Sequence, residues 1–396
     1  AGPFFSTEVV DSRPDPVVYT SIAVSPTTNE PAIAYTTANE FEPGKFRHSL
    51  YFATHESGNW EIEQIGAITD SLGEMPSIAF APDGTAFIAY VETTGKYMDP
   101  PRTRVEVARR TSPRNWQRQV VDNGGDNTIF VYPSIAMKKD SNPAVAYISY
   151  DSQNASYRKK LWYASFSGSE WQKEMIPGVS AGGASRVEGG NCVLKFGEFD
   201  VESVFRERAT IAFTDPSHSE NLRWVFQGES IPWVVWNVDT SGSISYVDLT
   251  FWREKLGGSS YTDWPRLSYR IEMGNGMFVA ALKVDPGPPP QLVWERRLVD
   301  QQDSPGSGFF SNVEVLKKGT GGFELTYVAG RSGLLMAGRM GIENLVSGDY
   351  TVYTLPPSGA LDSGTSISMA KKTVLTAEKA VFSMISQGNL HYTEEL

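Results

Sequence analysis

Three stretches of the chain repeat one pattern at an almost constant spacing, and this repeat constrains the fold more than any other feature. Each stretch begins with Ser-Ile-Ala, passes through a turn to a run that ends in Ala-Tyr, and reaches a tryptophan after a third apolar run. The serines that open the stretches are Ser21, Ser77 and Ser134, which lie 56 and 57 positions apart. Four strand-like runs in a period of this length are typical of a β-propeller blade.

The repeated small and aromatic residues have a structural interpretation. Small residues are expected where the inner strands crowd the propeller axis. Tryptophan and tyrosine rings are expected to pack between neighbouring blades, because a large flat ring fills the space between two sheets. We therefore interpret the periodic tryptophans, which are Trp60, Trp116 and Trp171, as core residues.

The rest of the chain extends this repeat less regularly. We predict a single all-β domain over 1–396, a seven-bladed propeller with four-stranded antiparallel blades. The predicted blades cover 19–68, 75–122, 132–178, 186–240, 262–303, 311–354 and 365–396. The segment from Ser243 to Lys255 is interpreted as an insertion with its own strand, and the count becomes six if the region from Ser243 to Pro290 is misread.

The last predicted blade has only three strands, at 366–369, 380–383 and 390–393. A fourth strand signal lies at the other end of the chain, at 4–11, and it ends in Val-Val-Asp like the outer strand of the second blade. We predict that this N-terminal strand completes the last blade. Such pairing closes the ring and removes two exposed sheet edges.

Composition argues against several classes of function. The formal net charge of -11 argues against general affinity for nucleic acid or anionic membranes. No apolar run is long enough to span a membrane, and the single cysteine, Cys192, cannot form an internal disulfide. The chain has no phosphate-binding glycine loop and no zinc-ligand spacing. We expect no cofactor, and a structural metal ion is left open.

Two features of the sequence favour an extracellular location. The chain opens at Ala1 without a methionine, which fits a processed mature protein. Asn154-Ala155-Ser156 is a glycosylation sequon. We predict a secreted monomer whose partner is an oligo- or polysaccharide.

Ligands of propellers usually meet the face formed by the loops that enter each inner strand and the loops that join the second and third strands. By this fold-level analogy, these loops carry many arginine and aromatic residues here. Guanidinium groups bind carboxylates in a bidentate manner, and aromatic faces stack on the apolar side of pyranose rings. The pattern favours a sugar that carries a carboxylate. The predicted binding residues are Tyr19, Arg47, His48, Tyr132, Arg186, Trp264, Arg266 and Arg331.

The unit Pro-Ser-Ile-Ala, a turn, Ile-Ala-Tyr, Leu-x-Tyr-Ala and Gly-x-x-Trp, which recurs over 19–171, resembles the blade repeat of secreted seven-bladed propellers that act on plant and algal polysaccharides. That group includes ulvan lyases, rhamnose–glucuronate lyases and propeller rhamnosidases. The resemblance implies the propeller fold and suggests cleavage of a uronate-containing glycan by β-elimination. In the lyase members, a histidine and a tyrosine at the starts of the loops between the second and third strands work beside an arginine.

The resemblance suggests a catalytic set in the third and fourth blades. Elimination needs the uronate carboxylate neutralised, a base that removes the C5 proton and an acid that protonates the departing oxygen. We assign Tyr150 as base or acid, His218 as its partner, and Arg158 or Arg223 as the neutralising group. The sequence departs from the lyase pattern at Tyr132, which stands in a position that can be histidine, and the paired loop of the second blade has no basic residue.

Two other function classes stay open. A glycoside hydrolase would use a carboxylate pair drawn from Asp151, Asp215 and Glu74. A lectin or interaction scaffold would perform no chemistry, although the divergence of the later blades favours one specialised site over a repeated one. The predicted insertion, with Tyr246 and Trp252, either walls a pocket or packs on the rim.

Overall fold

Strands make up almost all of the chain that the computed structural model describes. The described residues are 5–396 apart from 44, 57, 67–70, 95–101, 126, 154–158, 177–190, 202–203, 216–220, 230–231, 243, 258–259, 272–275, 286–290, 302–310, 319–322, 332–333, 342–349 and 356–366. Within this part of the chain no helix is long and apolar enough to cross a membrane.

Within the described residues, the strands pair into seven four-stranded antiparallel sheets. The first three sheets are β2 (Val17–Val24), β3 (Pro31–Glu42), β4 (Lys45–Glu56), β5 (Asn59–Ile65); β6 (Ser71–Phe80), β7 (Ala86–Thr94), β8 (Arg102–Ser112), β9 (Asn115–Asp122); and β10 (Thr128–Met137), β11 (Pro143–Asp151), β12 (Lys160–Phe166), β13 (Trp171–Met175). The next two are β14 (Cys192–Val201), β15 (Val204–Asp215), β16 (Asn221–Gln227), β17 (Trp233–Asp239); and β18 (Ile244–Gly257), β19 (Ser260–Ile271), β20 (Gly276–Asp285), β21 (Gln291–Gln301). The last two are β22 (Ser311–Lys317), β23 (Phe323–Arg331), β24 (Leu334–Gly341), β25 (Tyr350–Leu355); and β26 (Ile367–Val374), β27 (Ala377–Ser386), β28 (Asn389–Glu395), β1 (Phe5–Asp11).

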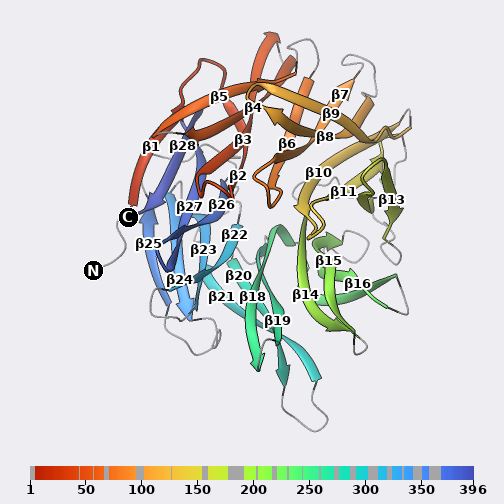
Figure 1. The fold of residues 1–396 in the computed structure, drawn as a ribbon, viewed down its shortest axis with the longest axis vertical. Coiled ribbons are helices and arrows are strands. Elements are labelled where there is room, and N and C mark those ends of the chain that lie inside the picture. The colour runs from red at the N-terminus through yellow and green to blue at the C-terminus, as the bar shows by residue number, and fades with distance from the viewer. Residues whose placement is uncertain are drawn as a thin grey trace.

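The sheets are arranged around a central axis (Figure 1). In six of the described sheets the strands follow chain order from the inside outward, and in the sheet that begins with β26 the outermost strand is β1. Residues from the first strand of every sheet line one axial cavity, which places β2, β6, β10, β14, β18, β22 and β26 next to the axis. The prediction of an all-β propeller with four-stranded antiparallel blades is therefore confirmed. Side chains are described in all four strands of six blades, whereas in the sheet β22–β25 they are described only for 312–318 and 324–326.

The two ends of the chain meet in one sheet. Strand β1 pairs antiparallel with β28 from Phe5↔Glu395 to Asp11↔Leu390, and Figure 1 shows the two strands side by side at the left. The N-terminal strand thus completes the last blade, as its sequence predicted. The hydrogen bonds between β1 and β28 therefore join the two ends of the chain and close the ring of blades.

The predicted insertion from Ser243 to Lys255 is wrong. This segment is β18, the inner strand of the fifth blade, and the predicted start of that blade at position 262 lies within the second strand, β19. Strand β18 lacks the Ser-Ile-Ala signature that marked the inner strands of the first three blades. Its buried Ile244, Val247 and Leu249 still face the core, with a bulge between Ser245 and Asp248.

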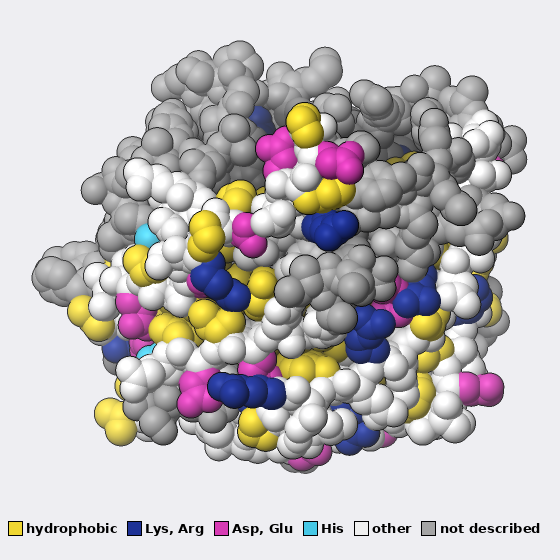
Figure 2. Space-filling view, turned by 90° about the horizontal axis from the view of Figure 1, so that it is seen from above, with side chains coloured by type: hydrophobic (Ala, Val, Ile, Leu, Met, Phe, Trp, Pro, Cys, Tyr) yellow, Lys and Arg dark blue, Asp and Glu magenta, His cyan; other side chains and the backbone are white. Residues whose placement is uncertain are grey.

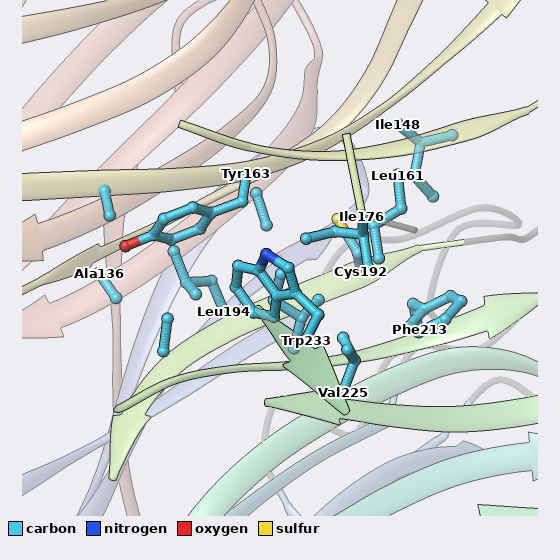
Figure 3. Packing of buried hydrophobic residues seen from close by; sticks show 14 residues of the cluster. Ala136, Ile148, Leu161, Tyr163, Ile176, Cys192, Leu194, Phe213, Val225 and Trp233 are labelled. Carbon is cyan, nitrogen blue, oxygen red and sulfur yellow. The ribbon is translucent and has the colours of Figure 1, made fainter. Parts of the chain in front are cut away.

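Hydrophobic clusters hold neighbouring sheets together. The described clusters lie between successive sheets around the ring. In the cluster between the third and fourth blades, the Trp233 indole lies among Leu194, Cys192 and the Tyr163 ring (Figure 3). The Tyr163 and Trp233 rings meet edge to face with their centroids 5.2 Å apart. The core therefore consists of layers between sheets, not a single centre.

The tyrosines of the Ala-Tyr repeat are structural, as the sequence indicated. Tyr35, Tyr90 and Tyr147 are completely buried. The Tyr147 hydroxyl donates to Asp122 Oδ2 at 2.8 Å, and Tyr35 donates to Asp11 Oδ2 at 2.6 Å. In both pairs the aspartate ends the outer strand of the preceding blade. Each pair therefore links two blades and satisfies a buried hydroxyl.

Short polar side chains of the inner strands link one blade to the next. Each accepts a hydrogen bond from a backbone N–H of the following blade. The pairs are Ser21 with Ile78 at 3.2 Å, Ser77 with Ile135 at 3.1 Å, Ser134 with Leu194 at 2.9 Å, Asp248 with Val313 at 3.0 Å, and Ser368 with Ile22 at 3.1 Å. The small residue in each repeat is thus required both by crowding at the axis and by this bond.

The rim of the ring carries mixed charges. Figure 2 shows lysine and arginine side chains lying beside aspartate and glutamate on the described part of this edge. Examples are Arg110 with Glu63 at 2.5 Å and Lys173 with Asp122 at 2.6 Å. Charges on outer strands oppose edge-to-edge pairing with other chains.

We expect that Ser134→Ala lowers the free energy of unfolding by about 1–3 kcal/mol, because it leaves the Leu194 N–H without its partner in a buried place. The measurement is the midpoint of urea unfolding. Ser169→Ala, in the exposed turn between β12 and β13, is the matched control and should leave the midpoint within error. Equal midpoints for both variants would contradict the role of this bond.

Candidate functional site

An axial cavity of about 230 Å³ opens where the inner strands begin. We call this side of the ring the upper face. The second strand of each blade ends there, because it runs antiparallel to the first. The upper face is therefore the side on which the sequence predicted ligand binding.

The inner strands are bulged at the mouth of this cavity. Bulges at matching places interrupt β6, β10 and β18, each just before the residue whose side chain bonds to the next blade, and the register of β2 shifts slightly earlier, between Val17 and Tyr19. Such bulges bend a strand and re-aim its side chains, and they are frequent next to binding sites.

Four side chains at these bulges line the mouth, and we call them the collar: Tyr19, Met75, Tyr132 and Tyr246. Met75, Tyr132 and Tyr246 have φ values of 53°, 53° and 52°, in the left-handed region. This backbone conformation costs about 1–2 kcal/mol for a residue with a side chain. Three bulky residues pay this cost at equivalent places, so the collar is a strained feature of the kind that gathers at functional sites.

Polar and charged groups line the cavity below the collar. Lys195 of β14 and Asp248 of β18 both contribute to the lining. The Asp248 carboxylate accepts the backbone N–H of Leu249 at 2.9 Å and that of Val313 at 3.0 Å. Burial raises the pKa of Asp248 to about 6, and the Lys195 charge limits that rise.

A tyrosine, a histidine and a glutamate gather beside the mouth, between the first and second blades. His48 Nδ1 at the start of β4 lies 3.1 Å from Glu74 Oε1 of β6. Thr93 Oγ1 donates to the same glutamate oxygen at 3.3 Å. Burial, together with the Glu74 charge, raises the pKa of Tyr19, so this hydroxyl stays protonated at neutral pH. The cluster of Tyr19, His48 and Glu74 combines a proton donor with an oriented imidazole.

The structure gathers several of the predicted binding residues at the upper face. Tyr19 and Tyr132 belong to the collar, and His48 adjoins Tyr19 through Glu74. Arg47 precedes His48 in β4, and its guanidinium carbon lies 4.4 Å from the centre of the Phe41 ring. Among the described residues, Arg47 Nε has no hydrogen-bond partner.

The predicted catalytic group of the third and fourth blades is described only in part. Tyr150 is half-buried near the end of β11, at the upper face. Arg223 of β16 pairs with Asp215 of β15 at 3.0 Å, and both are buried. His218 and Arg158 lie outside the described residues, as does Arg186, and the side chain of Arg331 is likewise not described.

Two predicted binding residues are not in loops of the upper face. Trp264 and Arg266 lie within β19, opposite Trp252 and Thr250 of β18, because the inner strand of this blade is β18. Trp264 Nε1 donates to Glu254 Oε2 at 2.7 Å. Arg266 is 3% exposed, and its burial lowers its pKa to about 10. Trp264 is half-buried and Arg266 is buried, and both lie within the second strand of the blade, so the prediction that they stand in strand-entry loops is wrong.

Sequence reasoning missed the cavity itself, because it depends on bulges in four separate strands. Lys195, Asp248 and Met75 were not recognised, and Tyr246 was placed on the supposed insertion. One signal was present: Met75 and Tyr132 each precede Pro-Ser in the repeat, and Tyr246 precedes Val-Asp in the same register. In the described part of the chain, no group of three or more His, Cys, Asp or Glu residues could hold a metal ion.

We expect the Asp248 carboxylate to make stability depend on pH. Its folded pKa of about 6 exceeds the ordinary value of 3.8, so between these pH values the folded protein binds the proton more tightly than the unfolded chain. The free energy of unfolding should therefore fall as the pH rises from about 4 to 6, by at most about 3 kcal/mol from this group. Urea midpoints across this range, for the wild type and Asp248→Asn, measure the effect. Parallel pH profiles for the two proteins would contradict it.

No family model matches the chain, and no curated protein matches it. Solved structures are similar over most of its length. The intramolecular trans-sialidase from Ruminococcus gnavus is 9% identical, with 85% of this chain and 97% of that chain covered and a TM-score of 0.49. The GH93 α-L-arabinofuranosidase of Fusarium graminearum is 12% identical, with 89% and 98% covered and a TM-score of 0.48. Polysaccharide lyase Uly1 is 10% identical, with 95% and 89% covered and a TM-score of 0.48. At these values the similarities carry no argument about what this chain does.

Proposed function

We propose that the protein is a carbohydrate-active enzyme that cleaves a uronate-containing glycan by β-elimination at the upper face. The observation that carries the proposal is the cluster of Tyr19, His48 and Glu74 beside the collar. It offers a base and an acid next to a cavity with aromatic walls, which is the combination that elimination from a polysaccharide requires. A rhamnose–glucuronate linkage is one example of the bond that we propose is cleaved.

The imidazole of His48 is the base in this proposal. Glu74 accepts the proton on Nδ1, so Nε2 is the basic nitrogen of the neutral ring. It removes the C5 proton of the uronate, and the electron pair forms the C4=C5 double bond as the C4–O bond breaks. Glu74 orients the ring and stabilises the imidazolium that results.

The hydroxyl of Tyr19 is the acid. A tyrosine whose pKa is raised keeps its proton at neutral pH and can transfer it to the oxygen that leaves C4. A tyrosine that acts as the base needs the opposite shift, a lowered pKa, so that it loses its proton first. The nearby Glu74 charge therefore favours the acid role for Tyr19.

A cation must neutralise the uronate carboxylate before C5 becomes acidic. Arg223 is committed to Asp215 in a buried pair, so the neutralising group that remains from the sequence prediction is Arg158. Arg47, Arg186 and Arg331 are proposed to bind further carboxylates along the glycan. Tyr150 with His218 stays a second prediction for the acid and base.

A glycoside hydrolase is the runner-up. Asp215 is completely buried against Arg223 and cannot reach a substrate, which removes one of the predicted carboxylates. Glu74 is 29% exposed and Asp151 is exposed, so a hydrolase would use these two. A secreted, monomeric protein remains part of the proposal on sequence grounds alone.

The first test is incubation with uronate polysaccharides, including ulvan and rhamnose-capped arabinogalactan. Ultraviolet absorbance of the conjugated, unsaturated uronate is expected to rise, since only elimination produces it. New reducing ends without this absorbance would establish a hydrolase. Binding without either signal would establish a lectin.

We expect His48→Gln and Tyr19→Phe each to lower kcat/KM for elimination by roughly 100- to 10,000-fold. His55→Gln is the matched control: His55 lies at the other end of β4, is 21% exposed against 20% for His48, and also contacts a glutamate, Glu30, at 3.2 Å. It should retain wild-type activity. Full activity in His48→Gln with loss in Tyr150→Phe would move the catalytic group to the third blade.

A further inference from the structure

The axial cavity contains polar side chains that the proposed acid–base chemistry at its mouth does not use. Lys195, Asp248 and the inner-strand serines lie below the collar, inside the cavity. Tyr19 belongs both to the cavity lining and to the proposed catalytic cluster. A sugar bound in the cavity would therefore adjoin the bond that is cleaved.

We propose that the axial cavity binds one uncharged pyranose residue of the glycan, held by the collar and by the polar wall beneath it. This deepens the proposed function and rests on it: the uronate lies across Tyr19 and His48, and an uncharged neighbouring sugar enters the axis. The ligand class is a neutral pyranose, recognised by its hydroxyl groups and its apolar ring faces.

The collar supplies surfaces for the sugar ring. Tyrosine rings stack on the apolar faces of pyranoses, and their hydroxyls can bond at the same time. Two hydrogen bonds hold the collar backbone in place: Tyr132 N–H donates to Met75 Sδ at 3.3 Å, and Cys192 Sγ–H donates to Tyr132 O at 3.2 Å. Met75, Tyr132 and Tyr246 adopt the left-handed backbone conformation within β6, β10 and β18, and their side chains line the mouth.

The wall below the collar offers both donors and acceptors. Ser21 and Ser77 accept backbone N–H groups through their hydroxyl oxygens, which leaves the hydroxyl protons as donors. Lys195 adds an ammonium donor, and Asp248 adds carboxylate acceptors. Sugar hydroxyls both donate and accept, so they match this mixed lining better than a ligand of one polarity.

The charges around the cavity oppose a carboxylate inside it. Asp248 and the neighbouring Glu314 of β22 are acidic, and Lys195 is the cation that acts on Asp248. A uronate at this depth would lie beside the Asp248 carboxylate, on which the Lys195 charge already acts. A neutral sugar avoids this repulsion, and the uronate next to it in the glycan can remain at the mouth of the cavity.

The size of the cavity is consistent with one residue. A volume of about 230 Å³ is more than ten times the roughly 10–15 Å³ that one water molecule needs. The mouth is bounded by the collar on several blades, so a chain that enters the axis places a single ring there while its next residue lies across the upper face.

The test is binding without turnover. Methyl glycosides of glucose, galactose, mannose and rhamnose, and methyl glucuronoside, are titrated into the wild-type protein and followed by ligand-observed NMR. At least one uncharged glycoside should bind at least tenfold more tightly than methyl glucuronoside. Equal or tighter binding of the glucuronoside, or no binding of any uncharged glycoside, overturns the proposal.

Tyr132→Gly and Tyr246→Gly remove the rings while relieving the left-handed backbone, because glycine adopts this φ freely. Each should weaken binding of the uncharged glycoside at least tenfold and leave the melting temperature within a few degrees. Leu375→Gly is the matched control, at a φ of 57° in the turn between β26 and β27, at the other end of the inner strand from the mouth, and 95% exposed. It should bind like the wild type. Unchanged affinity in both tyrosine variants would show that the collar is only structural.

The outcomes separate this inference from the proposed function. Elimination activity together with no binding of uncharged glycosides leaves the function standing and ends the inference. Collar-dependent binding without elimination leaves the sugar pocket standing and ends the proposed lyase.

Discussion

The structure depends on a hydrogen bond that recurs around its axis, from a backbone N–H of one inner strand to a short polar side chain of the strand before it. Ser134 with Leu194 is the most buried example, and Ser368 with Ile22 joins the last blade to the first. Inner strands that converge on one axis leave little room, so the bond requires a short side chain such as serine or aspartate. The periodic serines are therefore the consequence of crowding and of the need to satisfy buried amides.

This constraint also shapes the candidate site. The bulges lie immediately before the residue that makes the axial bond, as at Tyr132 before Ser134 and at Tyr246 before Asp248. The strand must regain its register below the bulge, so the residue at the bulge takes a left-handed φ and extends into the mouth. Farther out, buried pairs such as Tyr147 with Asp122 fix adjacent blades, which gives the mouth a rigid frame.

The candidate site has two parts, the axial cavity and the His48–Glu74 pair beside its mouth. The cavity is a product of the inner strands alone, whereas the His48–Glu74 pair needs the third strand of one blade to meet the first strand of the next. Tyr19 lies where the two parts join, and the same burial that places it in the collar raises its pKa. Arg223 shows the opposite outcome: its partner Asp215 is buried with it, so the pair stabilises the fourth blade and cannot take part in chemistry at the surface.

The sequence by itself determined the propeller, because a repeat of four strands with small and aromatic residues at fixed places has few other ways to bury its faces. It also determined that the N-terminal strand closes the last blade, and it identified Tyr19, His48 and Tyr132 as residues of the upper face. It failed at the fifth blade, where Asp248 makes the axial bond that serine makes elsewhere, and so Trp264 and Arg266 were assigned to the wrong strand. Only the tertiary structure decided that His48 meets Glu74 and that the collar surrounds a cavity with Lys195 and Asp248. These contacts join different blades, and the cavity also depends on bulges that no local pattern specifies.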